Sequence, residues 1–179
     1  MARARDLKGD KENIIAVIGD GSLSGGEALE GLDFASELQS NFIIIVNDND
    51  MSIAENHGGL YKNLKELRES KGTCACNLFK AMNLDYIYVE DGNNLETLIH
   101  TFYDVKDINH PIVVHINTQK GKGYQIAEEN KENWHWCMPF DIETGKPKVT
   151  FEGENYGDLT ADYLLYKMKK DSKVVALVA

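Results

Sequence analysis

The chain has 179 residues, of which 42% are hydrophobic and 27% charged, values typical of a globular domain and not of a disordered or membrane-embedded chain. Its formal net charge of −10 argues against general binding to nucleic acids or membrane surfaces, so we expect no partner of either kind. The sequence has no apolar run long enough to span a bilayer and no secretory signal, and its three cysteines lack a disulfide framework, which favours reduced thiols in the cytoplasm.

Four short apolar runs, rich in isoleucine and valine, predict the strands of a single sheet. They span residues 14–19, 42–47, 86–89 and 112–117. The runs do not alternate strictly between apolar and polar residues, which is typical of parallel strands covered on both faces. Helical patterns lie between them, one starting near Gly25 or Glu27 and one over residues 94–105. This alternation predicts an α/β fold with a doubly wound, mostly parallel sheet.

The first of these strands ends on Gly19, Asp20 and Gly21. A parallel strand delivers its last residue to the binding edge of the sheet, and glycines there let the backbone turn sharply and approach a ligand. The helix that follows offers its N-terminal amides to an anion. An aspartate at this point would repel a phosphate unless a cation lay between them. We therefore expect Asp20 to face a divalent metal ion that also binds a phosphate group.

The second strand ends in a run of four polar residues, Asn47, Asp48, Asn49 and Asp50. Carboxylate and amide oxygens suit Mg²⁺, and neighbouring parallel strands reach the same edge of the sheet. Taken singly, Gly-Asp-Gly is often only a turn, and Asn-Asp-Asn-Asp is usually a solvated loop. Together, at the ends of two consecutive strands, the two patterns predict a metal–diphosphate site.

The last third of the sequence has a different character. Residues 118–155 are glycine-rich, polar and aromatic, which predicts a long ordered loop or linker. Residues 156–179 predict a helix, capped by Asp158 or Thr160, followed by an apolar strand. We expect this strand to open a second domain.

The cysteines raise one alternative, a zinc site built from Cys74, Cys76 and Cys137 with His57 or His135. Structural zinc sites usually contain Cys-x-x-Cys pairs, whereas a single residue separates Cys74 from Cys76. Unpaired thiols are therefore the preferred interpretation.

Several stretches carry a family resemblance. Gly19-Asp20-Gly21, followed 28 residues after Gly21 by Asn49, looks like the thiamine diphosphate motif. Together, four stretches are similar to the 1-deoxy-D-xylulose-5-phosphate synthase family of the transketolase superfamily: "VIGDGSLSGGEALEGL", "NDNDMSIAEN", "INTQKGKGY" and "HWCMPFD". The resemblance implies the thiamine diphosphate-binding fold, here truncated. It makes residues 1–117 a partial diphosphate-binding domain, 118–155 an active-site loop and interdomain linker, and 156–179 the start of the pyrimidine-binding domain.

The resemblance also assigns ligands at the two strand ends. It implies that Asp20 and Asn49 bind magnesium through their side chains and Met51 through its backbone carbonyl. It makes Gly21 and Ser22, with Asn49, the residues that hold the cofactor diphosphate.

Two aromatic residues further along match family positions. Tyr124 would contact the cofactor region, and its alternative is a loop aromatic. His135 matches the active-site histidine, which would hydrogen-bond substrate or assist proton transfer; its alternative is packing between Trp134 and Trp136. His115 lies within an apolar strand and is interpreted as a core histidine.

The implied activity is that of a thiamine diphosphate- and Mg²⁺-dependent transferase that condenses pyruvate with glyceraldehyde 3-phosphate and releases CO₂. Its product would feed isoprenoid and thiamine biosynthesis, and the full-length enzyme would be a cytoplasmic homodimer. Alternatives are a transketolase, one half of a split transketolase-like enzyme, a non-catalytic module that binds metal and diphosphate, and a flavodoxin-like protein.

The sequence departs from the family pattern in three ways. Residues 54–79 abbreviate a long family segment, and "MARARDLKGD" resembles an internal one, so we expect family residues to precede Met1. The glutamate that activates the cofactor belongs to the second domain. We therefore expect the 179 residues alone to be inactive.

Overall fold

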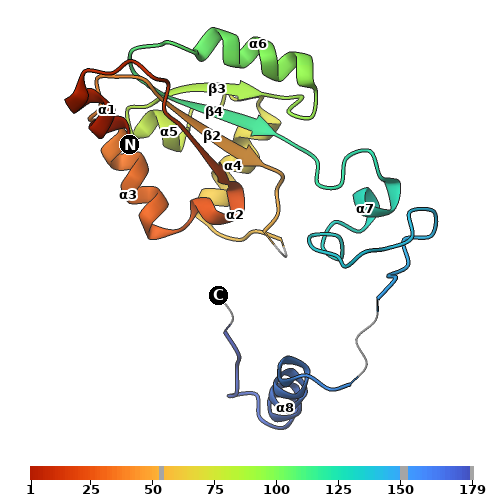
Figure 1. The fold of residues 1–179 in the computed structure, drawn as a ribbon. Coiled ribbons are helices and arrows are strands. Elements are labelled where there is room, and N and C mark those ends of the chain that lie inside the picture. Colours follow the sequence, from red (N-terminus) through yellow and green to blue (C-terminus); the bar gives the residue numbers. More distant parts are fainter. Residues whose placement is uncertain (53–54, 150–152, 178–179) are drawn as a thin grey trace. The chain divides into compact units, whose positions relative to one another are not determined.

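The structure, a computed structural model, describes residues 1–52, 55–149 and 153–177 (Figure 1). The chain divides into two compact units, Met1–Trp136 and Cys137–Ala179. The first unit contains the whole sheet and is built of alternating strands and helices. None of the described helices is both long and apolar enough to cross a membrane.

The described sheet has four strands, all parallel, in the order β1-β2-β4-β3. The strands are β1 (Ile15–Gly19), β2 (Phe42–Asp48), β3 (Asp85–Val89) and β4 (Pro111–Asn117). Each boundary lies within one residue of the predicted one. The predicted class, a doubly wound parallel α/β sheet, is confirmed.

Seven helices accompany this sheet in the described part of the first unit. They are α1 (Ala2–Lys8), α2 (Asp20–Leu23), α3 (Gly26–Ala35), α4 (Gly59–Glu69), α5 (Leu78–Ala81), α6 (Leu95–Val105) and α7 (Gln125–Glu129). The two predicted helices are α3, which begins directly after Gly25, and α6. Helix α4 was not predicted, although Leu60, Leu64 and Leu67 recur on one face of it and pack into the core.

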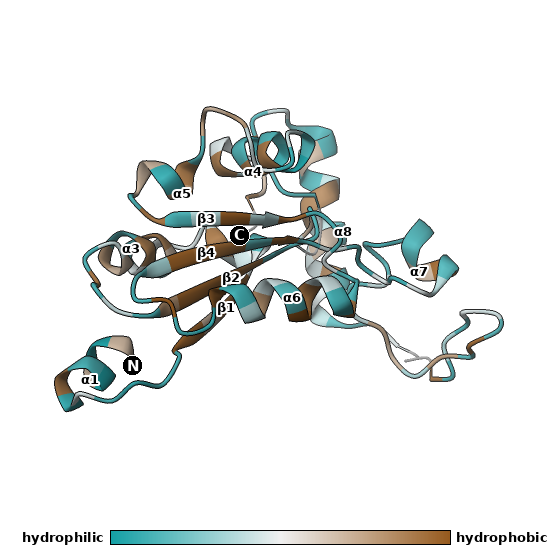
Figure 2. Cartoon of the chain, turned by 90° about the horizontal axis from the view of Figure 1, so that it is seen from above, coloured by the Kyte–Doolittle hydropathy of each residue, from teal (hydrophilic) through white to brown (hydrophobic). Residues whose placement is uncertain are grey.

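The handedness of the connections decides which face each helix covers. The connections through α3 and through α4 and α5 both move from β1 toward β3, whereas α6 leads back from β3 to β4. Because such crossovers are right-handed, α3, α4 and α5 lie on one face and α6 on the other (Figure 1). Hydrophobic residues predominate in β1 and β2, whereas β3 is mixed (Figure 2).

Each face of the sheet has its own core. Leu32, Leu64 and Phe79 pack with strand residues such as Val46 on the face of α3, α4 and α5. Val105 of α6 packs with the other strand residues on the opposite face: Ile43, Val89, Ile112, Val114 and Ile116. Among the described helices only α6 covers this second face, and Ile15 and Val17 of β1 remain 56% and 69% exposed.

The second unit consists of a short turn and one long helix. Phe140 and Pro147 form an isolated antiparallel bridge, and α8 (Tyr156–Lys170) follows. The predicted caps Asp158 and Thr160 are wrong. Asn155 caps the helix, with its Oδ1 accepting the Asp158 N–H at 2.9 Å, because residue 158 already lies within the first turn.

The apolar strand predicted after this helix is also not formed in residues 172–177, and its last two residues, 178 and 179, lie outside the described part of the chain. The described residues 172–177 adopt a turn followed by irregular backbone. A strand forms only against a hydrogen-bonding neighbour, and the described residues 137–177 contain no other strand to pair with it. The predicted loop over 118–155 is irregular except for α7 and the bridge at Phe140, in the part that is described.

Candidate metal and diphosphate site

The carboxyl ends of β1 and β2 lie side by side. In the parallel register Gly19 pairs with Asn47, so the residues that follow them, Asp20 and Asp48, leave the sheet at the same edge. Asp20 is 2% exposed at the start of α2, and Asp48 is fully buried. The predicted convergence of the two polar strand ends is therefore present.

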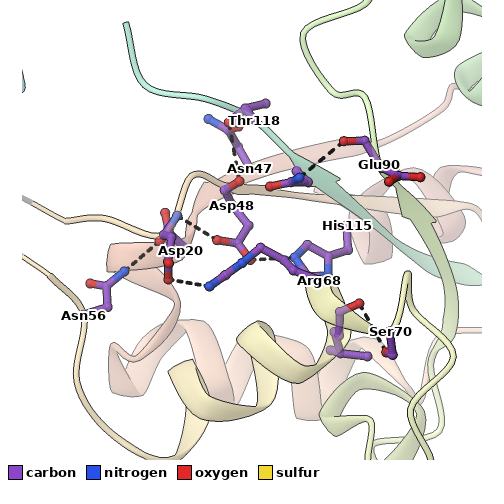
Figure 3. Close-up of polar contacts among 12 residues, drawn as sticks. Asp20, Asn47, Asp48, Asn56, Arg68, Ser70, Glu90, His115 and Thr118 are labelled. Carbon is purple, nitrogen blue, oxygen red and sulfur yellow. Dashed lines mark hydrogen bonds and ion pairs between the residues drawn. The ribbon is translucent and has the colours of Figure 1, made fainter. Parts of the chain in front are cut away.

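The Asp20 carboxylate lies among neutral hydrogen-bond donors. Asn56 Nδ2 donates to its Oδ2 at 2.7 Å (Figure 3). Burial raises the pKa of Asp20, and the nearby charge of Asp48 raises it further, against the effect of the nearby backbone N–H groups of Asn49 and Gly21. A cation bound here would offset both the lost hydration and the repulsion between the carboxylates.

Asn49 carries an unsatisfied atom at this point. Its side-chain Oδ1 is buried and has no hydrogen-bond partner among the described residues. Leaving a buried acceptor unpaired costs about 1–3 kcal/mol, so such an atom suggests a ligand. An amide oxygen is a suitable ligand for Mg²⁺, and the buried carboxylate of Asp20 lies at the same edge of the sheet. The residues present therefore fit a magnesium ion.

Gly21, Ser22 and Met51 complete the residues expected here. A Cβ on Gly21 would lie 2.7 Å from Ser52 Cβ, so the loop after β2 passes too close for any side chain at this position. Ser22 is exposed on α2. Met51 is half-buried and forms an isolated antiparallel bridge with Glu55. Gly21 and Ser22 directly follow Asp20 in α2, and Met51 lies in the loop after β2.

Asp48 has a different environment from Asp20. Its Oδ2 accepts hydrogen bonds from Arg68 Nη1 at 2.6 Å and from His115 Nε2 at 2.8 Å (Figure 3). Burial opposes its ionisation, but the hydrogen bonds from His115 and Arg68 and the charge of Arg68 outweigh it, so the pKa of Asp48 lies below its ordinary value. Asp48 is thus a paired carboxylate, whereas Asp20 lacks a cationic partner among the described residues.

His115 is a core histidine, as predicted. It is fully buried, and its Nδ1 hydrogen-bonds with the Tyr86 hydroxyl at 2.8 Å while Nε2 donates to Asp48. Neither Arg68 nor Asn56 was among the predicted site residues. Their partners lie 20 and 36 residues away in the sequence, so no local pattern identifies either pair.

Two clefts meet at the loop after β2. One, of about 760 Å³, is lined by Asn49, Met51 and Asn56 on one side and by residues 128–133 on the other. A second, of about 500 Å³, is lined by Asn49, Arg68 and Thr118 among others. Volumes of this size suit a small-molecule ligand. Asn49 borders both clefts.

Tyr124 and His135 lie apart from these linings. Among the described residues the lining of the larger cleft extends to Asn133 and includes neither of them. The Tyr124 ring contacts Trp134 edge to face, with 5.2 Å between the ring centroids, and Trp136 is 73% exposed. Nδ1 of His135 is buried without a hydrogen-bond partner in the described part of the chain. The cofactor contact of Tyr124 and the catalytic role of His135 stay predictions.

The thiols do not form disulfides. Cys74, Cys76 and Cys137 are free, and the last two are exposed. Among residues 1–52, 55–149 and 153–177, no three histidine, cysteine or acidic side chains gather in a metal-binding group. The magnesium ligands implied by the family resemblance are one carboxylate, one amide oxygen and one backbone carbonyl. This set contains only one acidic side chain, so it does not require a group of three such side chains.

The comparison with protein families decides the assignment. The family model described as 1-deoxy-D-xylulose-5-phosphate synthase matches residues 1–76 and 68–118. The chain belongs to the 1-deoxy-D-xylulose-5-phosphate synthase family. This membership agrees with the predicted thiamine diphosphate-binding fold and does not favour the transketolase, split-enzyme or non-catalytic alternatives.

Curated relatives carry the same name. The 1-deoxy-D-xylulose-5-phosphate synthases of Clostridium kluyveri and Natranaerobius thermophilus are each 34% identical, over 215 and 216 residues, and that of Syntrophotalea carbinolica is 35% identical over 216. Each alignment covers 100% of this chain and 34% of the relative, so the chain spans about a third of the length of the curated relatives it matches. A solved transketolase variant from Pichia stipitis is 19% identical, with a TM-score of 0.48, covering 92% of this chain and 24% of its own.

The alignments also bear on the abbreviated segment. The two family matches overlap at residues 68–76, and the relatives align over more positions than the 179 of this chain. Both observations agree with the predicted loss of family residues within 54–79. In the structure a short connection, residues 70–77, joins α4 to α5 at this place.

Proposed function

We propose that this chain supplies the metal- and diphosphate-binding part of a transferase of the 1-deoxy-D-xylulose-5-phosphate synthase type. The complete enzyme would use thiamine diphosphate and Mg²⁺ to condense pyruvate with glyceraldehyde 3-phosphate, with loss of CO₂. One observation carries the proposal for this chain. The buried, unpaired Oδ1 of Asn49 lies on the loop that follows β2, at the same edge of the sheet as Asp20, a buried carboxylate with a raised pKa.

The residues at the two strand ends divide the binding between them. The side chains of Asp20 and Asn49 and the backbone carbonyl of Met51 would hold Mg²⁺, while Gly21 and Ser22, with Asn49, would bind the diphosphate. When bound, thiamine diphosphate supplies the electron sink for decarboxylation of a 2-oxo acid. The contribution of this chain is to anchor the diphosphate and so to fix where the reactive ring lies.

Two further residues are proposed for the reaction itself. Tyr124 would contact the cofactor region, and His135 would hydrogen-bond the substrate or move a proton. The buried Nδ1 of His135 supports this role, because it has no partner in the described residues and is therefore free to accept a hydrogen bond or a proton.

The remaining proposals concern the complete protein. Residues 1–117 would form part of the diphosphate-binding domain, 118–155 an active-site loop and linker, and 156–179 the start of the pyrimidine-binding domain. The complete enzyme would be a cytoplasmic homodimer that serves isoprenoid and thiamine biosynthesis. Because the activating glutamate would lie in the second domain, the 179 residues alone should show no turnover of pyruvate and glyceraldehyde 3-phosphate.

Isothermal titration of the chain with thiamine diphosphate and MgCl₂ tests the binding site. Asp20→Asn and Asn49→Ala should each weaken binding by about 10- to 100-fold, since each removes a proposed metal ligand. Asp33→Asn is the matched control, because it removes one exposed carboxylate from the neighbouring helix α3. Equal affinity of wild type and both site variants would refute the proposed site.

A further inference from the structure

The buried carboxylate of Asp48 holds the loop that carries Asn49, because both of its oxygens accept hydrogen bonds. Besides Arg68 and His115 on its Oδ2, Asp48 accepts the backbone N–H of Asp50 on its Oδ1 at 3.0 Å. This last hydrogen bond spans Asn49, so the Asp48 side chain sets the backbone path around it. Asp50 accordingly adopts a left-handed conformation, with φ 61°.

Arg68 binds both neighbours of Asn49. Its side chain, 13% exposed, extends from the last turn of α4; Nη1 donates to Asp48, and Nη2 donates to Oδ1 of Asp50. Figure 3 shows the guanidinium beside the Asp48 carboxylate. A planar guanidinium can bridge two carboxylates in this way, whereas a lysine ammonium acts as a single point charge.

This arrangement determines how Asn49 is presented. Its backbone N–H lies near the Asp20 carboxyl, and its side-chain Oδ1 is buried without a partner among the described residues. Neither of these groups touches Arg68, yet the residues on both sides of Asn49 do. A loop with one left-handed residue would have many alternative conformations without such a clamp.

We propose that Arg68 is a positioning residue that clamps residues 48–50 so that the Asn49 amide oxygen is presented to a divalent cation. The inference rests on the proposed function, because it takes the strand ends as the cation site. It adds a residue from outside the predicted ligand set, on the helix that directly precedes the shortened connection 70–77.

Binding of Mn²⁺ to the full chain, measured by electron paramagnetic resonance in the presence of thiamine diphosphate, tests this role. Arg68→Lys keeps the positive charge beside Asp48, so it leaves the net charge at the cation site unchanged. We expect it to weaken Mn²⁺ binding about tenfold with little change in Tm. Glu66→Gln is the control, since Glu66 lies on the same helix, is exposed and lines neither of the two clefts.

Hydrogen exchange of the ligand-free chain gives a second readout that no metal affects. Asp50→Asn weakens one arm of the clamp while Asp48 stays paired with Arg68 and His115. Both Arg68→Lys and Asp50→Asn should speed exchange at residues 49–52 and leave α6 and β4 unchanged.

The outcomes separate the two proposals. Wild-type Mn²⁺ affinity in Arg68→Lys would overturn the clamp alone, as would faster exchange spread evenly over the sheet, which would indicate a general loss of stability. Failure of the wild-type chain to bind Mn²⁺ would overturn the proposed cation site and the clamp with it.

Discussion

At the scale of single residues, two buried aspartates at one edge of the sheet differ in their partners. Asp48 has a guanidinium and an imidazole, and its pKa is lowered; Asp20 has neutral donors only among the described residues, and its pKa is raised, first by burial and then by the charge of Asp48. The difference divides their roles. Asp48 stabilises the loop, whereas Asp20 is left with uncompensated charge that a cation would neutralise.

This difference predicts that Asp20 lowers the stability of the metal-free chain. A carboxyl whose pKa is raised on folding binds protons more readily in the folded state, so its ionisation at neutral pH favours unfolding. Asp20→Asn should therefore increase the Tm of the metal-free chain at pH 7 by about 2–4 °C, measured by circular dichroism. Asp33→Asn, on the exposed face of α3, should leave Tm unchanged. A decrease in Tm for Asp20→Asn would show that its hydrogen bonds outweigh its charge.

The convergence of the two strand ends was predicted from the sequence, whereas the residues that hold the Asp48 side chain were not. Asp20 and Asn49 follow apolar strands, and the rule that parallel strands end at one edge is enough to bring them together. The pairing of Asp48 with Arg68 and His115 depends instead on how α4 crosses the sheet and on which face of β4 is turned toward it. The predicted cap of α8 was wrong for a local reason, since Asn155, Asp158 and Thr160 are all suitable capping residues and only the backbone decides among them.

At the scale of elements, the connection between α4 and α5 shows how a shortened segment can still be closed tightly. Lys71 and Gly72 both adopt left-handed conformations, with φ 52° and 79°. The turn lies against the end of β3, and Lys71 Nζ pairs at 2.9 Å with Glu90, the residue that follows this strand. A Cβ on Gly72 would lie 2.6 Å from Tyr88 Cβ, so the helix end and the strand approach each other as closely as a glycine permits.

Gly72 should therefore be far more sensitive to substitution than its backbone angle alone suggests. Gly72→Ala combines a left-handed conformation with a steric clash and should destabilise the chain by about 2–4 kcal/mol in urea unfolding. Gly9→Ala is the matched control, because Gly9 has a similar φ of 76° and nothing within 4 Å of the added Cβ. It should cost about 1 kcal/mol. Equal losses for the two variants would mean that β3 moves away to accommodate the methyl group.

At the scale of the whole molecule, the apolar core is confined to one part of the sequence. All the buried hydrophobic residues of the described chain lie between Ala2 and Ala127, whereas α8 buries none of its residues. The strands that form this core could be predicted because each is a short run of mostly apolar residues. The strand predicted near the C-terminus has the same composition, but composition alone does not provide a neighbouring strand.

This distribution predicts that residues 1–136 fold without the remainder of the chain. A protein ending at Trp136 retains all four strands and both helix layers described here, so it should unfold cooperatively with a Tm within about 2 °C of the 179-residue chain. Removing α8 takes away little buried apolar surface, and the urea m-value should change little for the same reason.

The 1–136 protein should also bind Mn²⁺ and thiamine diphosphate as the longer chain does, because Asp20, Asn49 and Met51 all precede the cut. A protein ending at Lys106 is the control: it lacks β4, which lies between β2 and β3, and should be unfolded. Loss of cooperative unfolding in the 1–136 protein would show that residues 137–179 contribute to the stability of the sheet.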